Sequence, residues 1–96
     1  MILAAALLLA AQADDDIVVL GRRLALISAS VRRDADGRYR CALDGTTGNL
    51  KLDSGLCRAA TDCVRKGAAG QDAIASCLGK RKPKLLARLR AERGGR

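Results

Sequence analysis

Four cysteines set the main constraint on how this chain can fold: Cys41, Cys57, Cys63 and Cys77. The chain has 96 residues, enough for one domain, and Tyr39 is its single aromatic residue. After position 13, alanine supplies 12 of the 35 apolar residues, so few large side chains are left to fill an interior. A core this thin is expected to depend on crosslinks between cysteines.

Several kinds of functional site are excluded by what the sequence lacks. It contains no Trp, Phe or His, which removes aromatic cages, base-stacking platforms, Ser-His or Cys-His catalysis and His-containing metal sites. Four aspartates are better explained as turn and cap residues than as an acid–base pair: Asp34, Asp36, Asp44 and Asp53. The sequence therefore predicts a protein that is not an enzyme and holds no cofactor or metal.

The N-terminal segment indicates export. Residues 1–13 are apolar except for Gln12 and end in Ala-x-Ala, which is typical of a secretory signal peptide cleaved after Ala13. A buried N-terminal helix is the alternative, but three aspartates follow at once and such a helix would be apolar on every side. A periplasmic or secreted location is expected.

Export favours two disulfide bridges, because thiols pair in an oxidising compartment. Four buried free thiols, or one bridge with two free thiols, are the alternatives. The gaps between cysteines, 15, 5 and 13 residues, do not match the close pairs of zinc sites.

The middle of the chain predicts a β-hairpin after an extended segment at residues 14–23. Residues 24–31 alternate, with Ala25, Ile27, Ala29 and Val31 on one side, and residues 38–44 alternate in the same way. Asp36-Gly37 between them supplies the turn.

Two short helices are expected to cover this hairpin. The first begins at an N-cap, Asp53 or Ser54, and runs to about Lys66, with Gly67 as its stop; the second spans residues 72–78 and ends at Gly79. The predicted class is therefore α+β, a small hairpin and two short helices in a domain of residues 24–79, stapled by disulfides and followed by a basic tail at 80–96.

This layout favours one disulfide pairing. Cys57 and Cys63 lie on one helix, separated by a rise of about 9 Å, too far apart to bridge. Cys41 most simply meets Cys57, and Cys63 then joins Cys77, although the partners could be exchanged.

Residues 24–63 resemble the first half of the TonB C-terminal domain family. The motifs that carry the resemblance are Asp36-Gly37 at the turn, Thr46-Thr47-Gly48 in the loop and Leu52-Asp53 at the helix start. Some family members carry cysteines where Cys41 and Cys57 stand. The family's third strand has no counterpart after Lys66, so the resemblance does not imply energy transduction.

The segment before the hairpin is similar to the short segment by which TonB-dependent receptors add a strand to TonB. Its apolar residues are Ile17, Val18, Val19 and Leu20. A strand of this kind could pair with an envelope protein through its free backbone groups, but a plain first strand or a lead-in segment is the favoured interpretation.

The chain has a formal net charge of +8, and nearly all of it lies in the tail. Residues 80–96 contain eight basic residues and one acidic residue. Seven of its residues are candidates for binding an anionic surface: Lys80, Arg81, Lys82, Lys84, Arg88, Arg90 and Arg93. Pro83 could begin a helix there, and a partly disordered, solvated tail is the alternative.

The sequence thus predicts a small exported interaction module of the cell envelope that pairs through a strand edge. The alternative is a cationic effector or envelope-surface binder that acts on anionic lipid or another polyanion through its tail. Nucleic acid is not an expected partner, since no aromatic residues are interleaved with the charges.

Overall fold

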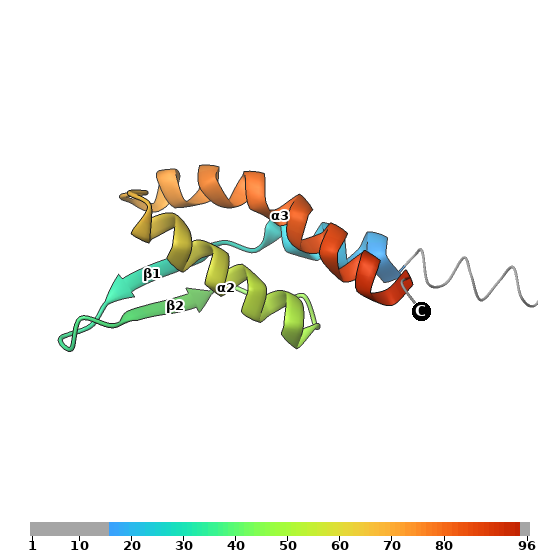
Figure 1. Cartoon of the computed structure of the whole chain (residues 1–96), viewed down its shortest axis with the longest axis horizontal. Coiled ribbons are helices and arrows are strands. Elements are labelled where there is room, and N and C mark those ends of the chain that lie inside the picture. The colour runs from blue at the N-terminus through green and yellow to red at the C-terminus, as the bar shows by residue number, and fades with distance from the viewer. Residues whose placement is uncertain (1–15, 95–96) are drawn as a thin grey trace, which may run out of the picture.

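A computed structural model describes residues 16–94, which form a β-hairpin and three helices (Figure 1). Residues 16–26 are helical and lead into β1 (Ala29–Arg33) and β2 (Tyr39–Leu43). Helices α2 (Leu50–Arg65) and α3 (Gln71–Gly94) follow. The predicted α+β class is confirmed, whereas the predicted signal peptide at 1–13 lies outside the described residues.

The extended conformation expected at residues 14–23 is wrong where the structure describes it, because residues 16–26 form a helix. Ile17, Leu20 and Leu24 are buried at helical spacing, and Ile27 just beyond the helix is buried as well. The run Ile-Val-Val-Leu favours a strand locally, but packing one face of a helix on the core outweighs that preference. The helix lies beside the C-terminal half of α3 (Figure 1), where Asp16 pairs with Arg93.

The hairpin forms with its turn where the sequence places it. β1 and β2 are antiparallel, with Ala29 opposite Leu43 and Arg33 opposite Tyr39. Asp34 accepts hydrogen bonds from the backbone N–H groups of Asp36 (3.0 Å) and Arg38 (2.9 Å), and Gly37 has φ +80°. The first strand is shorter than predicted because residues 24–26 belong to the preceding helix.

Helix α2 begins earlier than predicted. Asn49 is the N-cap, and its side chain accepts a hydrogen bond from Leu52 N at 3.0 Å. Asp53 instead accepts from the backbone N–H of Thr47 (3.0 Å) and from the hydroxyl groups of Thr46 and Thr47. The C-terminal stop is confirmed, since Gly67 follows Arg65 and Lys66 with φ +109°.

Helix α3 is the largest departure from the predicted fold. It is one helix of 24 residues that continues through Gly79 and contains Pro83 in its interior. Proline cannot donate to the carbonyl of Gly79 four residues earlier, and the helix axis changes direction near its middle (Figure 1). Residues 80–94 of the predicted separate tail therefore belong to α3, and Leu85, Leu86 and Leu89 pack this part of the helix against the core.

The two disulfides link the hairpin to α2 and α2 to α3. Cys41 is bonded to Cys57 with their Cα atoms 5.7 Å apart, and Cys63 is bonded to Cys77 at 6.1 Å. The favoured pairing is thus confirmed, and all four cysteines are bridged. Bridges of this kind indicate an oxidising environment. Within residues 16–94, no helix is long and apolar enough to cross a membrane.

Candidate functional site: a basic groove between α2 and α3

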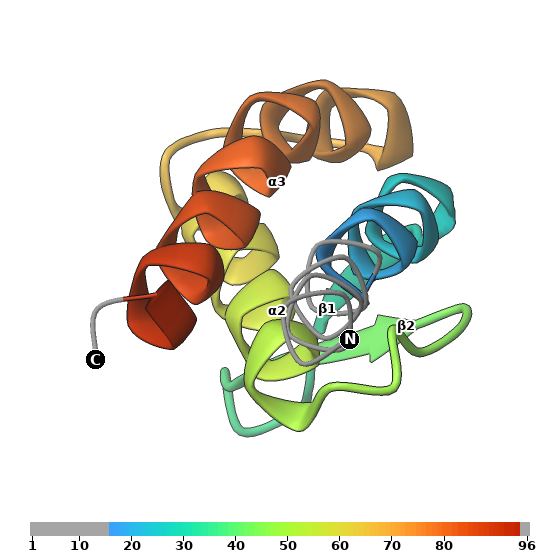
Figure 2. The ribbon, with the colours of Figure 1, turned by 90° about the vertical axis from the view of Figure 1, so that its right-hand side faces the viewer.

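Close packing of α3 on α2 shapes a groove along one side of the molecule. A Cβ built on Gly55 would lie 3.2 Å from Leu85 Cδ2, so the helices approach where α2 has no side chain. Leu52, Leu85 and Leu89 form the apolar floor. The groove encloses about 150 Å³ and continues through shared residues into a second hollow of about 480 Å³. Figure 2 shows α3 crossing α2 along this side.

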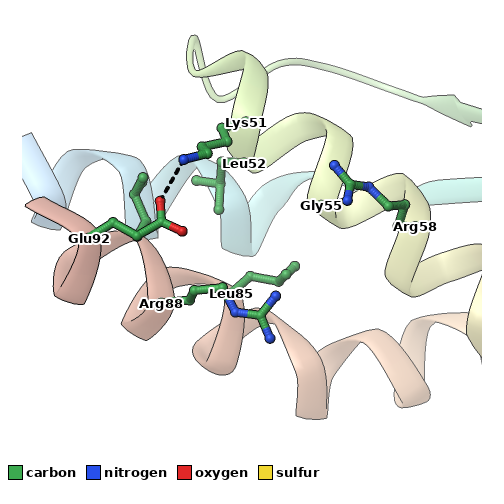
Figure 3. Close-up of a pocket in the computed structure, with 8 residues that line it drawn as sticks. Lys51, Leu52, Gly55, Arg58, Leu85, Arg88 and Glu92 are labelled. Carbon is green, nitrogen blue, oxygen red and sulfur yellow. Dashed lines mark hydrogen bonds and ion pairs between the residues drawn. The ribbon is translucent and has the colours of Figure 1, made fainter.

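Basic side chains from both helices line the groove and the hollow. The lining residues that carry positive charge are Lys51 and Arg58 of α2, Lys66 at its C-cap, and Arg81, Lys84 and Arg88 of α3. Two carboxylates face them, Asp62 and Glu92. Figure 3 shows Arg58 extending from α2 and Arg88 from α3 on the two sides of the groove. With six cations and two carboxylates, the lining of the groove and the hollow has a positive net charge.

The two carboxylates of the groove are already paired. Lys51 Nζ lies 2.9 Å from Glu92 Oε2 (Figure 3), and its hydrogen bond holds the pKa of Glu92 below the ordinary value. Arg81 donates to Asp62, and Lys66 Nζ lies 3.2 Å from the same oxygen. The hydrogen bond from Arg81, followed by that from Lys66, lowers the pKa of Asp62. Both carboxylates therefore stay ionised at neutral pH.

Three cations of the groove form no ion pair with any residue between 16 and 94: Arg58, Lys84 and Arg88. All three residues are exposed. Two of them are guanidinium groups, whose planar N–H donors match carboxylate, sulfate and phosphate oxygens. The groove can therefore bind an anionic group, with little cost from breaking internal pairs.

The structure places the seven tail residues predicted to bind an anionic surface in different surroundings. Arg81, Lys84 and Arg88 line the groove, whereas Lys80 and Arg90 are exposed outside it. Two others serve the fold, as Arg93 pairs with Asp16 and Lys82 points inward.

Lys82 supports the end of the N-terminal helix. Its Nζ donates to the backbone carbonyls of Ile27 at 2.7 Å and Ala25 at 3.4 Å. Burial lowers the pKa of Lys82, and the charge of Asp44 partly offsets that effect. Lys82 therefore stabilises the packing of α3 against the end of the N-terminal helix.

Sequence reasoning missed the contribution of α2 to the groove. Lys51 and Arg58 are seven residues apart, a spacing that puts them on one face of a helix, and Lys66 lies at the helix end. That spacing could have indicated a basic face on α2. A prediction of residues 80–96 as a separate tail does not bring this face close to α3.

The predicted strand for partner binding is not a strand in the structure. Ile17 and Leu20 are 7% and 5% exposed and belong to the helical residues 16–26. Val18 and Val19 lie on the outer side of that helix, at 46% and 40% exposed. The backbone groups of this helical segment are thus not presented as a free edge.

No family model matches this chain, and comparison with curated proteins and with solved structures finds no similar protein.

Proposed function

We propose that this protein is a small exported binding module, not an enzyme, that holds anionic material of the cell envelope in the groove between α2 and α3. The observation that carries the proposal is a set of three exposed cations at a groove of net positive charge, Arg58, Lys84 and Arg88, which form no ion pair within residues 16–94. Cations that line a recessed site focus the electrostatic field there, and this field attracts anions before they contact the protein.

Export to the periplasm or beyond is part of the proposal. The apolar segment ending at Ala13 and the two disulfides both support it. Intact mass of the protein recovered from cells tests this step, because a product that begins at Asp14 is expected. Recovery of native protein that retains Met1 would contradict cleavage.

Binding is tested with the triple variant Arg58→Gln, Lys84→Gln and Arg88→Gln. The probes are soluble polyphosphate and vesicles of phosphatidylcholine with phosphatidylglycerol. Each cation near an anionic surface contributes about 1 kcal/mol, so the variant is expected to lose up to about 3 kcal/mol of binding free energy at low salt. Titration calorimetry for polyphosphate and co-sedimentation for vesicles measure the loss.

The matched control removes the same charge elsewhere: Arg22→Gln, Lys80→Gln and Arg90→Gln. These three residues are exposed, lie outside the groove and form no ion pair with the residues described. The control is expected to bind nearly as well as the wild type. Equal losses in both variants would show that only net charge matters and would overturn the groove as the site.

A second candidate function is pairing with an envelope protein through the edge of the hairpin. The sheet has only two strands within the described chain. Ladder bonds join Asp44 N to Ser28 O at 3.1 Å and Asp34 N to Arg38 O at 2.9 Å. Alternation along an antiparallel pair then leaves the backbone groups of Val31 and Cys41 facing outward, where an added strand could bind.

Photo-crosslinking in cells tests this second candidate. A photoreactive residue at Ala42, which is exposed on β2, is expected to capture a protein partner, and one at Ala87, which is exposed on α3, is not. The absence of any product specific to position 42 would contradict strand pairing. The resemblance to the TonB C-terminal domain stays a hypothesis.

A further inference from the structure

The cations of α2 form a stripe that is longer than the groove. Lys51, Arg58 and Arg65 are spaced seven residues apart, so they follow one another along the same face of the helix. The sequence separation of 14 between the first and the last corresponds to about 21 Å of helix. All three residues are exposed. The stripe thus begins at the groove and reaches the C-terminal end of α2.

At that end the stripe continues onto the hairpin. The Arg65 guanidinium carbon lies 5.3 Å from the centre of the Tyr39 ring, and that of Arg33 lies 5.1 Å from the same centre. One aromatic ring therefore holds together a cation from α2 and a cation from β1. Arg33 is also fixed by a hydrogen bond from its Nε to the carbonyl of Gly37 at 3.1 Å.

The acidic groups near this path leave its charge positive. Asp62 and Glu92 face the groove but are each bound to basic partners, and on the hairpin Asp34 is bound to Arg40 at 2.9 Å. Arg58, Arg65 and Arg33 form no ion pair with residues of the described chain. A ligand that follows the stripe past Lys51, which is paired with Glu92, meets three guanidinium groups that no carboxylate of residues 16–94 binds.

We propose that the ligand is a linear polyanion, a flexible chain of repeated phosphate, sulfate or carboxylate groups that runs from the groove along α2 to Arg33. This inference rests on the proposed function and specifies its ligand. Cations repeated along one helix face suit a chain with many equivalent anions, because each contact releases counterions from the polymer.

The surface favours such a chain over a lipid bilayer. Proteins that lie on membranes place exposed apolar side chains beside their cations. The large apolar residues that are exposed in residues 16–94 are Val18, Val19, Leu26 and Leu50, and none of them lines the groove. The leucines of the groove floor are buried or half-buried.

The inference is tested by measuring how tightly the whole mature protein binds polyphosphate chains of different length. Polyphosphate with a contour length of about 10 Å can join two cations one heptad apart, whereas a chain of about 40 Å can follow the whole stripe. The long chain is expected to bind at least about tenfold more tightly, after correction for the number of overlapping sites. Arg33→Gln with Arg65→Gln should weaken binding of the long chain about tenfold or more and that of the short chain less than about twofold.

Two further variants separate charge from packing. Arg33→Lys with Arg65→Lys keeps both charges and should retain binding of the long chain. Arg22→Gln with Arg90→Gln matches the net charge of the double Gln variant and should behave like the wild type.

Equal affinity for both lengths, binding to phosphatidylglycerol vesicles alone, or a Lys variant as weak as the Gln variant would overturn the polymer path and leave the groove proposal standing. Failure of every probe to bind would overturn both.

Discussion

Single residues at the start of α2 hold the loop that connects it to the hairpin. Thr47 is fully buried, and Asp53 Oδ1 accepts from its N–H at 3.0 Å and its hydroxyl at 2.6 Å. Burial alone would raise the pKa of Asp53, but the hydrogen bonds from Thr46 and Thr47 outweigh it, so the pKa lies below its ordinary value of 3.8. The carboxylate therefore stabilises the fold in its ionised form.

Replacing Asp53 by Asn should lower the free energy of unfolding by about 1–2 kcal/mol at pH 7, since three donors lose a charged acceptor. Because the folded pKa lies below the unfolded value, this stabilisation is complete above pH 3.8 and is lost as the pH falls through the folded pKa. Urea denaturation at several pH values measures the difference between wild type and variant, which should shrink in acid. Asp36→Asn, in the exposed hairpin turn, is the control and should change stability by less than about 0.5 kcal/mol. A difference that grows in acid would contradict this role of Asp53.

At the scale of elements, the second half of α3 belongs to the core even though its sequence is the most basic part of the chain. Leu89 is 7% exposed and packs in the same cluster as Leu20 and Leu52. Leu89→Ala is expected to cost about 2–4 kcal/mol of unfolding free energy, because it removes buried methyl groups and leaves a cavity. Leu26→Ala, at a residue 83% exposed, should cost less than about 0.5 kcal/mol. Thermal denaturation of both variants measures the contrast, and equal small effects would show that α3 is not docked beyond Pro83.

At the scale of the whole molecule, two disulfides hold three of the elements together. Each closes a loop of about 15 residues, for which the loss of chain entropy in the unfolded state corresponds to about 3 kcal/mol. The contribution of both bridges together is comparable to the total free energy of unfolding of a small domain.

Reduction should therefore abolish the cooperative thermal transition seen by circular dichroism, and the intact mass should rise by one hydrogen for each of the four cysteines. Either double variant, Cys41→Ser with Cys57→Ser or Cys63→Ser with Cys77→Ser, is expected to lose about half of this contribution. A reduced protein that melts at an unchanged temperature would contradict it.

The sequence by itself determined the features whose causes are local. Asp36-Gly37 specifies the turn because glycine accepts positive φ, and Gly67 ends α2 for the same reason. Helix spacing excluded a bridge between Cys57 and Cys63, whereas the choice of Cys41–Cys57 and Cys63–Cys77 over the exchanged pairing came from the tertiary structure. The α+β class followed from these features.

Only the tertiary structure decided the conformation of the segments at the two ends of the described chain and the position of the candidate site. The apolar run at 17–20 is compatible with a strand or a helix, and it is helical because a helix buries Ile17 and Leu20 against the core and α3.

Gly79 and Pro83 are local stop signals, yet α3 continues through both. Burial of Leu85, Leu86 and Leu89 stabilises the continued helix by more than the interrupted hydrogen bond costs. That continuation places Arg88 across the groove from Arg58, a proximity that depends on packing between helices and that no local pattern encodes.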